Sequence, residues 1–109
     1  MLSWQDFEKV DIRVGTIVEV NDFPKARKPA YKLLVDFGEL GMKRSSAQIT
    51  NFYAKEDLLN RQVIAVVNFP PKQIADFISE CLVLGVYTAE KDVVLLQPER
   101  PVTNGWKIG

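Results

Sequence analysis

The chain has 109 residues, 47% of them hydrophobic, and its 14 basic and 14 acidic side chains give it no net charge. This size and composition predict one domain, residues 1–109, with a packed core, and the charge balance argues against a strongly basic nucleic-acid clamp. The absence of histidine excludes histidine-based catalysis and histidine metal ligands, and a lone cysteine excludes an intramolecular disulfide or a cysteine zinc site. We expect no cofactor and no bound metal.

The first predicted elements are a short helix and a strand. Ser3 and Asp6 form a weak capping box, which predicts a helix over residues 4–9. The pattern then changes to period two, which predicts a strand over 12–20 that is buried on one face. A glycine inside that strand, Gly15, indicates a bulge or a tight barrel bend. The face expected to be buried comprises Ile12, Val14, Thr16, Val18 and Val20.

The rest of the chain contains more short strands, separated by glycines and prolines. Residues 21–30 hold two prolines and three positive charges and are expected to be irregular. A helix is predicted over 50–60 and a turn at Asn104-Gly105. This order is that of an OB-fold, so the predicted class is all-β, a five-stranded Greek-key barrel with a short N-terminal helix and a short helix between strands 3 and 4. The further strands are predicted at 31–37, 42–49, 63–69, 82–87 and 93–96.

Neither a membrane-spanning segment nor a catalytic group is evident. The longest apolar run, Val63–Val67, is too short for a membrane span, and the first residues do not resemble a signal peptide. Glu56 and Asp57 are expected to be solvated helix charges, and Cys81 to behave as a small hydrophobic residue. A single thiol suits the reducing cytoplasm. We therefore predict a cytoplasmic chain that is not inserted in a membrane and is not an enzyme.

Binding is better supported, because polar and charged side chains occur where OB-folds bind ligands. In that fold the ligand lies across the second and third strands, flanked by the loops between strands 1 and 2 and between strands 4 and 5. Cations, amides and an exposed aromatic suit single-stranded nucleic acid, and they suit an extended peptide almost as well. Ordinary loop polarity is a third interpretation. The candidate residues are Lys25, Arg27, Lys28, Tyr31, Lys32, Arg44, Ser46, Gln48, Asn68, Phe69, Pro70, Lys72 and Ser79.

Several stretches resemble a known family. Residues 11–18, DIRVGTIV, are similar to the opening strand of the tRNA-binding OB-domain family, whose members are appended to aminoacyl-tRNA synthetases or free-standing. Within that family, several stretches specifically resemble the CsaA group of secretion-associated chaperones, and the similarity covers nearly the whole chain. The matching stretches are FPKARKPA at 23–30, SSAQIT at 45–50, VIAVVNFPP at 63–71, DVVLLQP at 92–98 and NGWKIG at 104–109.

The resemblance implies a homodimer that binds unfolded or preprotein segments without ATP, with the preprotein translocase motor and tRNA as further partners. A Ser-x-x-Met element of the tRNA site in relatives falls on Ser79–Leu82, where Leu82 replaces the methionine. In the peptide-binding site that the resemblance implies, Phe69 would bury apolar client side chains, and Gln48 and Asn68 would pair with the client backbone. The dimer would be held by large apolar residues near the termini, which otherwise plug the barrel ends: Trp4, Phe7, Val102, Trp106 and Ile108.

One loop departs from the CsaA pattern. Gln73 stands where a basic residue is usual, and Asp76 stands where glycine is usual. Asp76 is expected to adopt the left-handed turn geometry that glycine would supply. Together with Glu80 it places negative charge where a phosphate backbone would approach, which favours peptide over tRNA. Three functions remain open: a peptide-binding chaperone, a tRNA-binding module, and a module that only recruits a partner protein.

Overall fold

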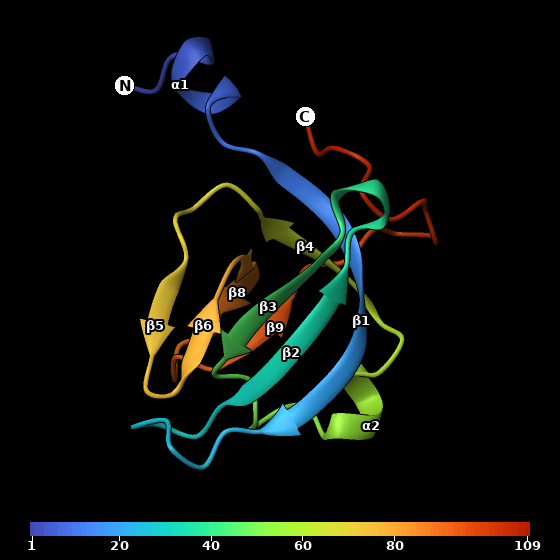
Figure 1. Ribbon diagram of the computed structural model, residues 1–109. Coiled ribbons are helices and arrows are strands. Elements are labelled where there is room, and N and C mark those ends of the chain that lie inside the picture. Colours follow the sequence, from blue (N-terminus) through green and yellow to red (C-terminus); the bar gives the residue numbers. More distant parts are fainter.

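A computed structural model describes residues 1–109 and consists mainly of short strands (Figure 1). Neither α-helix has the length and apolar character needed to cross a membrane. In chain order the elements are α1 (Trp4–Glu8), β1 (Ile12–Asp22), β2 (Tyr31–Asp36), the 3-10 turn η1 (Gly38–Leu40), β3 (Met42–Ala47), α2 (Lys55–Leu58), β4 (Gln62–Val66), β5 (Lys72–Ile74), β6 (Phe77–Ser79), β7 (Leu82–Val83), β8 (Gly85–Tyr87) and β9 (Val93–Leu95).

Five strands form one antiparallel sheet in the order β3-β2-β1-β4-β7. The sheet curls until its two edges approach each other, and the backbone amides of Glu80 and Cys81 donate to the carbonyl of Arg44 at 2.8 and 3.3 Å. These bonds join the segment before β7 to β3 and nearly close a barrel (Figure 1). The predicted all-β, OB-fold class is therefore confirmed.

The first strand does not bury the face that simple alternation predicts. Its register against β2 shifts between Ile17 and Glu19, so Val18 is an extra residue, a β-bulge that reverses the alternation. Ile17 points into the core and Val20 packs against it. The bulge thus lies beyond Gly15, whose role is close packing, since a Cβ there would lie 2.6 Å from Val35 Cγ1.

The same strand changes partners along its length. Its first half pairs with β4, and its second half pairs with β2. The edge left free beside the first half is taken by the C-terminal segment: the amide of Val14 donates to the carbonyl of Trp106 at 3.0 Å, and the amide of Ile108 donates to that of Ile12 at 2.9 Å. This segment explains why Val14 is buried although it does not face the core.

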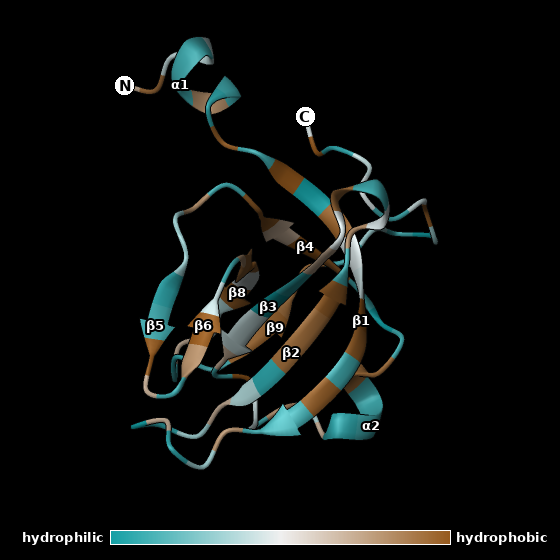
Figure 2. Ribbon diagram, in the orientation of Figure 1, coloured by the Kyte–Doolittle hydropathy of each residue, from teal (hydrophilic) through white to brown (hydrophobic).

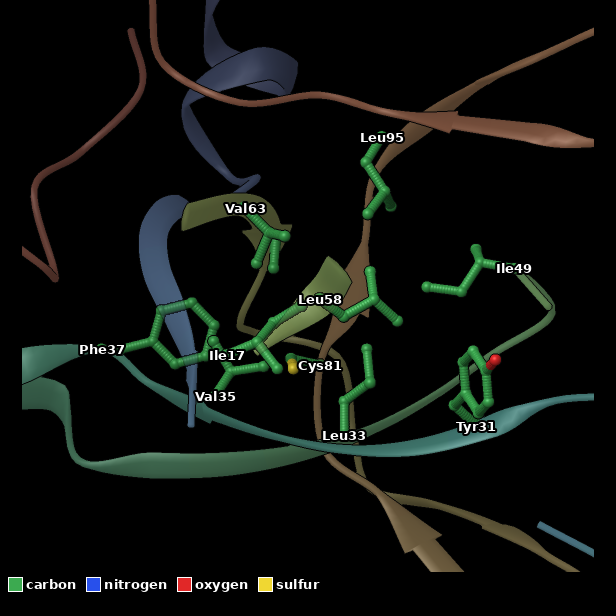
Figure 3. Close-up of a cluster of buried hydrophobic side chains, with 11 residues drawn as sticks. Ile17, Tyr31, Leu33, Val35, Phe37, Ile49, Leu58, Val63, Cys81 and Leu95 are labelled. Carbon is green, nitrogen blue, oxygen red and sulfur yellow. The ribbon is translucent and has the colours of Figure 1, made fainter. Parts of the chain in front are cut away.

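Eleven buried residues fill the barrel (Figure 3). Leu58, the one buried residue of α2, closes the end beneath β1, whereas Phe52 and Leu59 beside it are exposed. Tyr31, which we expected on the ligand face, is a core residue whose hydroxyl donates to the carbonyl of Tyr53 at 2.8 Å. The largest fully buried side chains are Ile17, Leu33, Val35, Phe37, Ser45, Leu58 and Val63, and each large apolar one contributes about 1.5–3 kcal/mol.

Two hairpins differ from the predicted strands. The predicted strand over 82–87 is broken at Leu84, and its second half, β8, pairs with β9 outside the main sheet. The hairpin of β5 and β6 was not predicted. Its turn places Ala75, and not Asp76, in the left-handed region, with φ at 53°. Alanine seldom adopts this conformation, so the sequence carries no turn signal there.

Candidate functional site

An apolar hollow of about 300 Å³ lies between β3 and the β5–β6 hairpin. Phe69 stands at its rim with 55% of its surface exposed, and Leu82 is exposed to 47%. Exposed side chains of this size beside a hollow offer a surface that water wets poorly. The lining residues are Ser46, Phe69, Pro70, Lys72, Ile74, Ser79, Glu80, Cys81 and Leu82, so six predicted binding residues come together here.

Some polar groups at this hollow form hydrogen bonds within the chain. The hydroxyl of Ser79 donates to the carbonyl of Cys81 at 3.3 Å, and the Oε1 atom of Glu80 accepts the amide of Arg44 at 3.0 Å. Burial raises the pKa of the Cys81 thiol to about 12, so the thiol is neutral at physiological pH. Cys81 therefore contributes apolar surface, as the sequence predicts.

A second hollow, of about 660 Å³, adjoins the first and is basic. Lys25, Arg27 and Lys28 reach it from the loop between β1 and β2, and Gln48 reaches it from beyond β3. Lys72 lines both hollows, which makes them one continuous surface. Figure 2 shows the hydrophilic β5 beside the more hydrophobic β6 at this place. An apolar side chain and an anionic group of one ligand can thus bind side by side.

A third hollow, of about 380 Å³, lies over the outer face of β1, β2 and β3. Arg44, the remaining predicted residue of the strand face, lines it with Lys32 and Phe77. Arg44 therefore lines a different hollow from Ser46 and Gln48, although all three hollows lie on the face that OB-folds commonly use for ligands, here called the ligand face.

Asn68 is not part of these hollows. Its Oδ1 atom accepts the amide of Asp11 at 3.0 Å, and its Nδ2 atom donates to the carbonyl of Lys9 at 2.7 Å. Both ends of the amide therefore fix the linker between α1 and β1. The pairing of Asn68 with a client backbone stays a prediction, because each end of this exposed amide can form a second hydrogen bond.

Sequence reasoning missed two contributors from the β5–β6 hairpin. Ile74 lines both the apolar and the basic hollow, and Phe77 lines the third. The available signal was the spacing that places Lys72, Ile74, Phe77 and Ser79 on one face of the hairpin. It was too short to stand out from a loop.

The termini leave large apolar groups uncovered. Helix α1 stands away from the barrel and buries none of its residues, and the C-terminus lies at the same end of the molecule (Figure 1). Trp4 is 79% exposed and Trp106 is 59% exposed, whereas Phe7 and Ile108 are half-buried. Val102 is also half-buried, but hydrogen bonds to the side chain of Gln62 hold it. The tryptophans do not plug the barrel ends.

Comparison with known proteins assigns the family. The family model described as "Putative tRNA binding domain" matches residues 12–107. The chain belongs to this tRNA-binding domain family. A methionine–tRNA ligase from Pyrococcus furiosus is 38% identical over 107 residues, which are 98% of this chain and 14% of the ligase. The chain thus spans about 14% of the length of such curated relatives.

Within the family, the chain is similar to proteins called CsaA. The crystal structure of chaperone CsaA from Bacillus anthracis is 54% identical with a TM-score of 0.95, covering 100% of this chain and 99% of that one. The CsaA chaperone protein from Picrophilus torridus is 58% identical with a TM-score of 0.94, and the match covers 100% of both chains. The resemblance to this group is therefore confirmed.

Proposed function

We propose that the chain is a non-enzymatic, peptide-binding chaperone module of the CsaA type, with extended segments of unfolded preproteins as its clients. The observation that carries the proposal is the continuous surface formed by the apolar hollow and the basic hollow. Exposed Phe69 and Leu82 lie in the first, and Arg27 and Lys28 lie in the second. The likeness to CsaA chaperones supports the same function.

The chemistry of this surface fits an extended peptide. An apolar client side chain enters beside Phe69, and every buried Å² contributes about 25 cal/mol. The hydroxyl of Ser46 and the amide of Gln48 pair with the client backbone. Acidic side chains or a terminal carboxylate of the client bind Arg27 and Lys28. No step needs ATP, because binding and release follow the affinity alone.

A tRNA-binding module is the second candidate, favoured by the family match and by the basic hollow. The phosphate backbone would contact the cations, and a base would stack on Phe69. In this second candidate Ser79 and Leu82 would contact the RNA, because they stand where the family resemblance places the Ser-x-x-Met element of the tRNA site.

A pair of titrations separates the two candidates. Fluorescence anisotropy is measured for a labelled denatured protein and for labelled bulk tRNA, each at about 50 and 200 mM salt. We expect the denatured client to bind with a weaker dependence on salt than tRNA would show, because part of its contact area is apolar and it carries fewer anionic groups. Tight tRNA binding with a steep salt dependence, and no client binding, would instead assign the surface to tRNA.

We further propose a homodimer joined through the end that carries both termini. Trp4 and Trp106 are the exposed anchors, with Phe7, Val102 and Ile108 beside them. Burying such aromatic surface between two copies is a common source of dimer stability. Sedimentation equilibrium at micromolar concentration should give twice 12.4 kDa, and Trp4→Ser should shift the mass toward the monomer. A wild-type mass of 12.4 kDa would contradict the dimer.

The cellular setting follows from the proposed clients. A chaperone for export-competent preproteins works in the cytoplasm and passes its clients to the preprotein translocase motor. The single reduced thiol suits that compartment.

A further inference from the structure

The loop between β1 and β2 packs against the β5–β6 hairpin through an aromatic cluster of Phe23, Lys32 and Phe77. The rings of Phe23 and Phe77 meet edge to face, with centroids 5.5 Å apart and planes inclined by 60°. The Nζ atom of Lys32 lies over both rings, at 5.0 and 5.7 Å from their centroids. Because Phe23 is buried, the cluster fixes the loop between β1 and β2 against the β5–β6 hairpin.

An ion pair lies beside this cluster. The Nζ atom of Lys25 is 3.4 Å from the Oδ2 atom of Asp76, which lies in the hairpin turn. Desolvation acts to raise the pKa of Asp76, but the hydrogen bond and charge of Lys25 and the charge of Lys32 outweigh it and lower the pKa. Asp76 is therefore ionised at neutral pH. Both partners are largely exposed, so the pair contributes little to folding stability.

The pair has a larger effect on the charge that the site offers to a ligand. Of the cations lining the basic hollow, Lys25 is neutralised within the chain, whereas Arg27, Lys28 and Lys72 have no ion-pair partner. A phosphate that contacts Lys25 must compete with this carboxylate for the ammonium group or bind beside it against its negative charge. A neutral apolar peptide meets no such competitor.

We infer that Asp76 is a specificity-determining residue, a built-in anion that occupies Lys25 and thereby disfavours polyanionic ligands relative to peptides. The inference rests on the proposed function, since it concerns the same surface. Glu80, the other acidic residue here, does not act in this way, because its carboxylate accepts the amide of Arg44 and has no cation partner. From the sequence, Asp76 and Glu80 were expected to repel a phosphate backbone in the same way. In the structure only Asp76 pairs with a cation of the basic hollow.

The test is Asp76→Asn, which keeps the shape of the side chain and removes its charge. Binding of labelled bulk tRNA is measured at about 50 and 200 mM salt. Lys25 then becomes available for one more phosphate, which steepens the salt dependence of log K by about 0.7–0.9. The gain in tRNA affinity over wild type should therefore be about 3-fold larger at 50 mM than at 200 mM salt. Affinity for the denatured client should stay within about 2-fold of wild type.

Two controls isolate the ion pair from bulk charge. Glu90→Gln makes the same change of charge in the turn between β8 and β9, where no ion pair exists, and it should leave the salt dependence unchanged. Lys25→Met should weaken tRNA binding at least about 3-fold more in the Asp76→Asn background than in wild type, because only there is Lys25 free.

Two results would overturn the inference: an equal effect of Asp76→Asn and Glu90→Gln, or strictly additive effects of the changes at positions 25 and 76. Each of these results leaves the proposed function standing as long as the client still binds. Loss of the proposed function would appear differently, as failure of wild type to bind denatured client at all.

Discussion

Replacement of Phe69 by alanine is expected to weaken the binding of a denatured client by about 10-fold or more. The ring is 55% exposed at the rim of the apolar hollow, so a client can cover on the order of 100 Å² of it, which corresponds to about 2.5 kcal/mol as an upper bound. A tenfold change in affinity needs about 1.4 kcal/mol. The dissociation constant is measured by anisotropy, and the melting temperature should stay unchanged because the ring is outside the core.

Phe52→Ala is the matched control. Phe52 is exposed to a similar extent, 50%, but it lines none of the three hollows on the ligand face. Its loss should leave client affinity unchanged. Equal binding by wild type and Phe69→Ala would remove Phe69 from the site, and with it the apolar anchor of the proposed function.

The second large effect is expected on the affinity for tRNA. Reversing both charges with Arg27→Glu and Lys28→Glu should reduce any tRNA affinity by at least about 100-fold, since each lost charge-assisted contact costs about 1.5–3 kcal/mol. The salt dependence of log K should also become shallower by about 1.5, because two phosphate contacts are lost. Labelled bulk tRNA titrated at two salt concentrations measures both quantities.

A control pair keeps the same change in net charge. Lys91→Glu with Arg100→Glu also reverses one lysine and one arginine, at exposed positions that line none of the three hollows on the ligand face. If this pair lowered tRNA affinity as much as the loop pair, the basic hollow would not be the RNA site and only overall charge would matter.

Much of the fold could be predicted because its signals are local. A period-two pattern located β1, short apolar runs bounded by glycine and proline located β2 to β4, and the order of elements indicated the barrel. The bulge at Val18 could not be predicted in the same way, because it depends on how β1 fits against β2. The β5–β6 hairpin was missed for a different reason: its strands are short, and its turn uses left-handed Ala75, where glycine or asparagine is usual.

The candidate site could likewise be predicted from the sequence only in part. The barrel topology brings two loops together, so six residues of the apolar hollow and the cations of the basic hollow could be named from sequence, but Ile74 could not. The use of Asn68 could not, because its partner Asp11 is 57 positions away and belongs to a linker without a pattern. The Lys25–Asp76 pair was likewise hidden, since the sequence places the two residues in different loops.

The position of the termini has a consequence for long clients. The C-terminal segment hydrogen-bonds to the first half of β1, so both chain ends leave the barrel together, away from the loop that carries Arg27 and Lys28 (Figure 1). Two copies joined at that end would each leave the basic loop of their binding surface open. One unfolded chain could then occupy both surfaces, and the second contact would form at a high effective concentration. Weak individual contacts would in this way hold a client by avidity and still release it quickly, segment by segment.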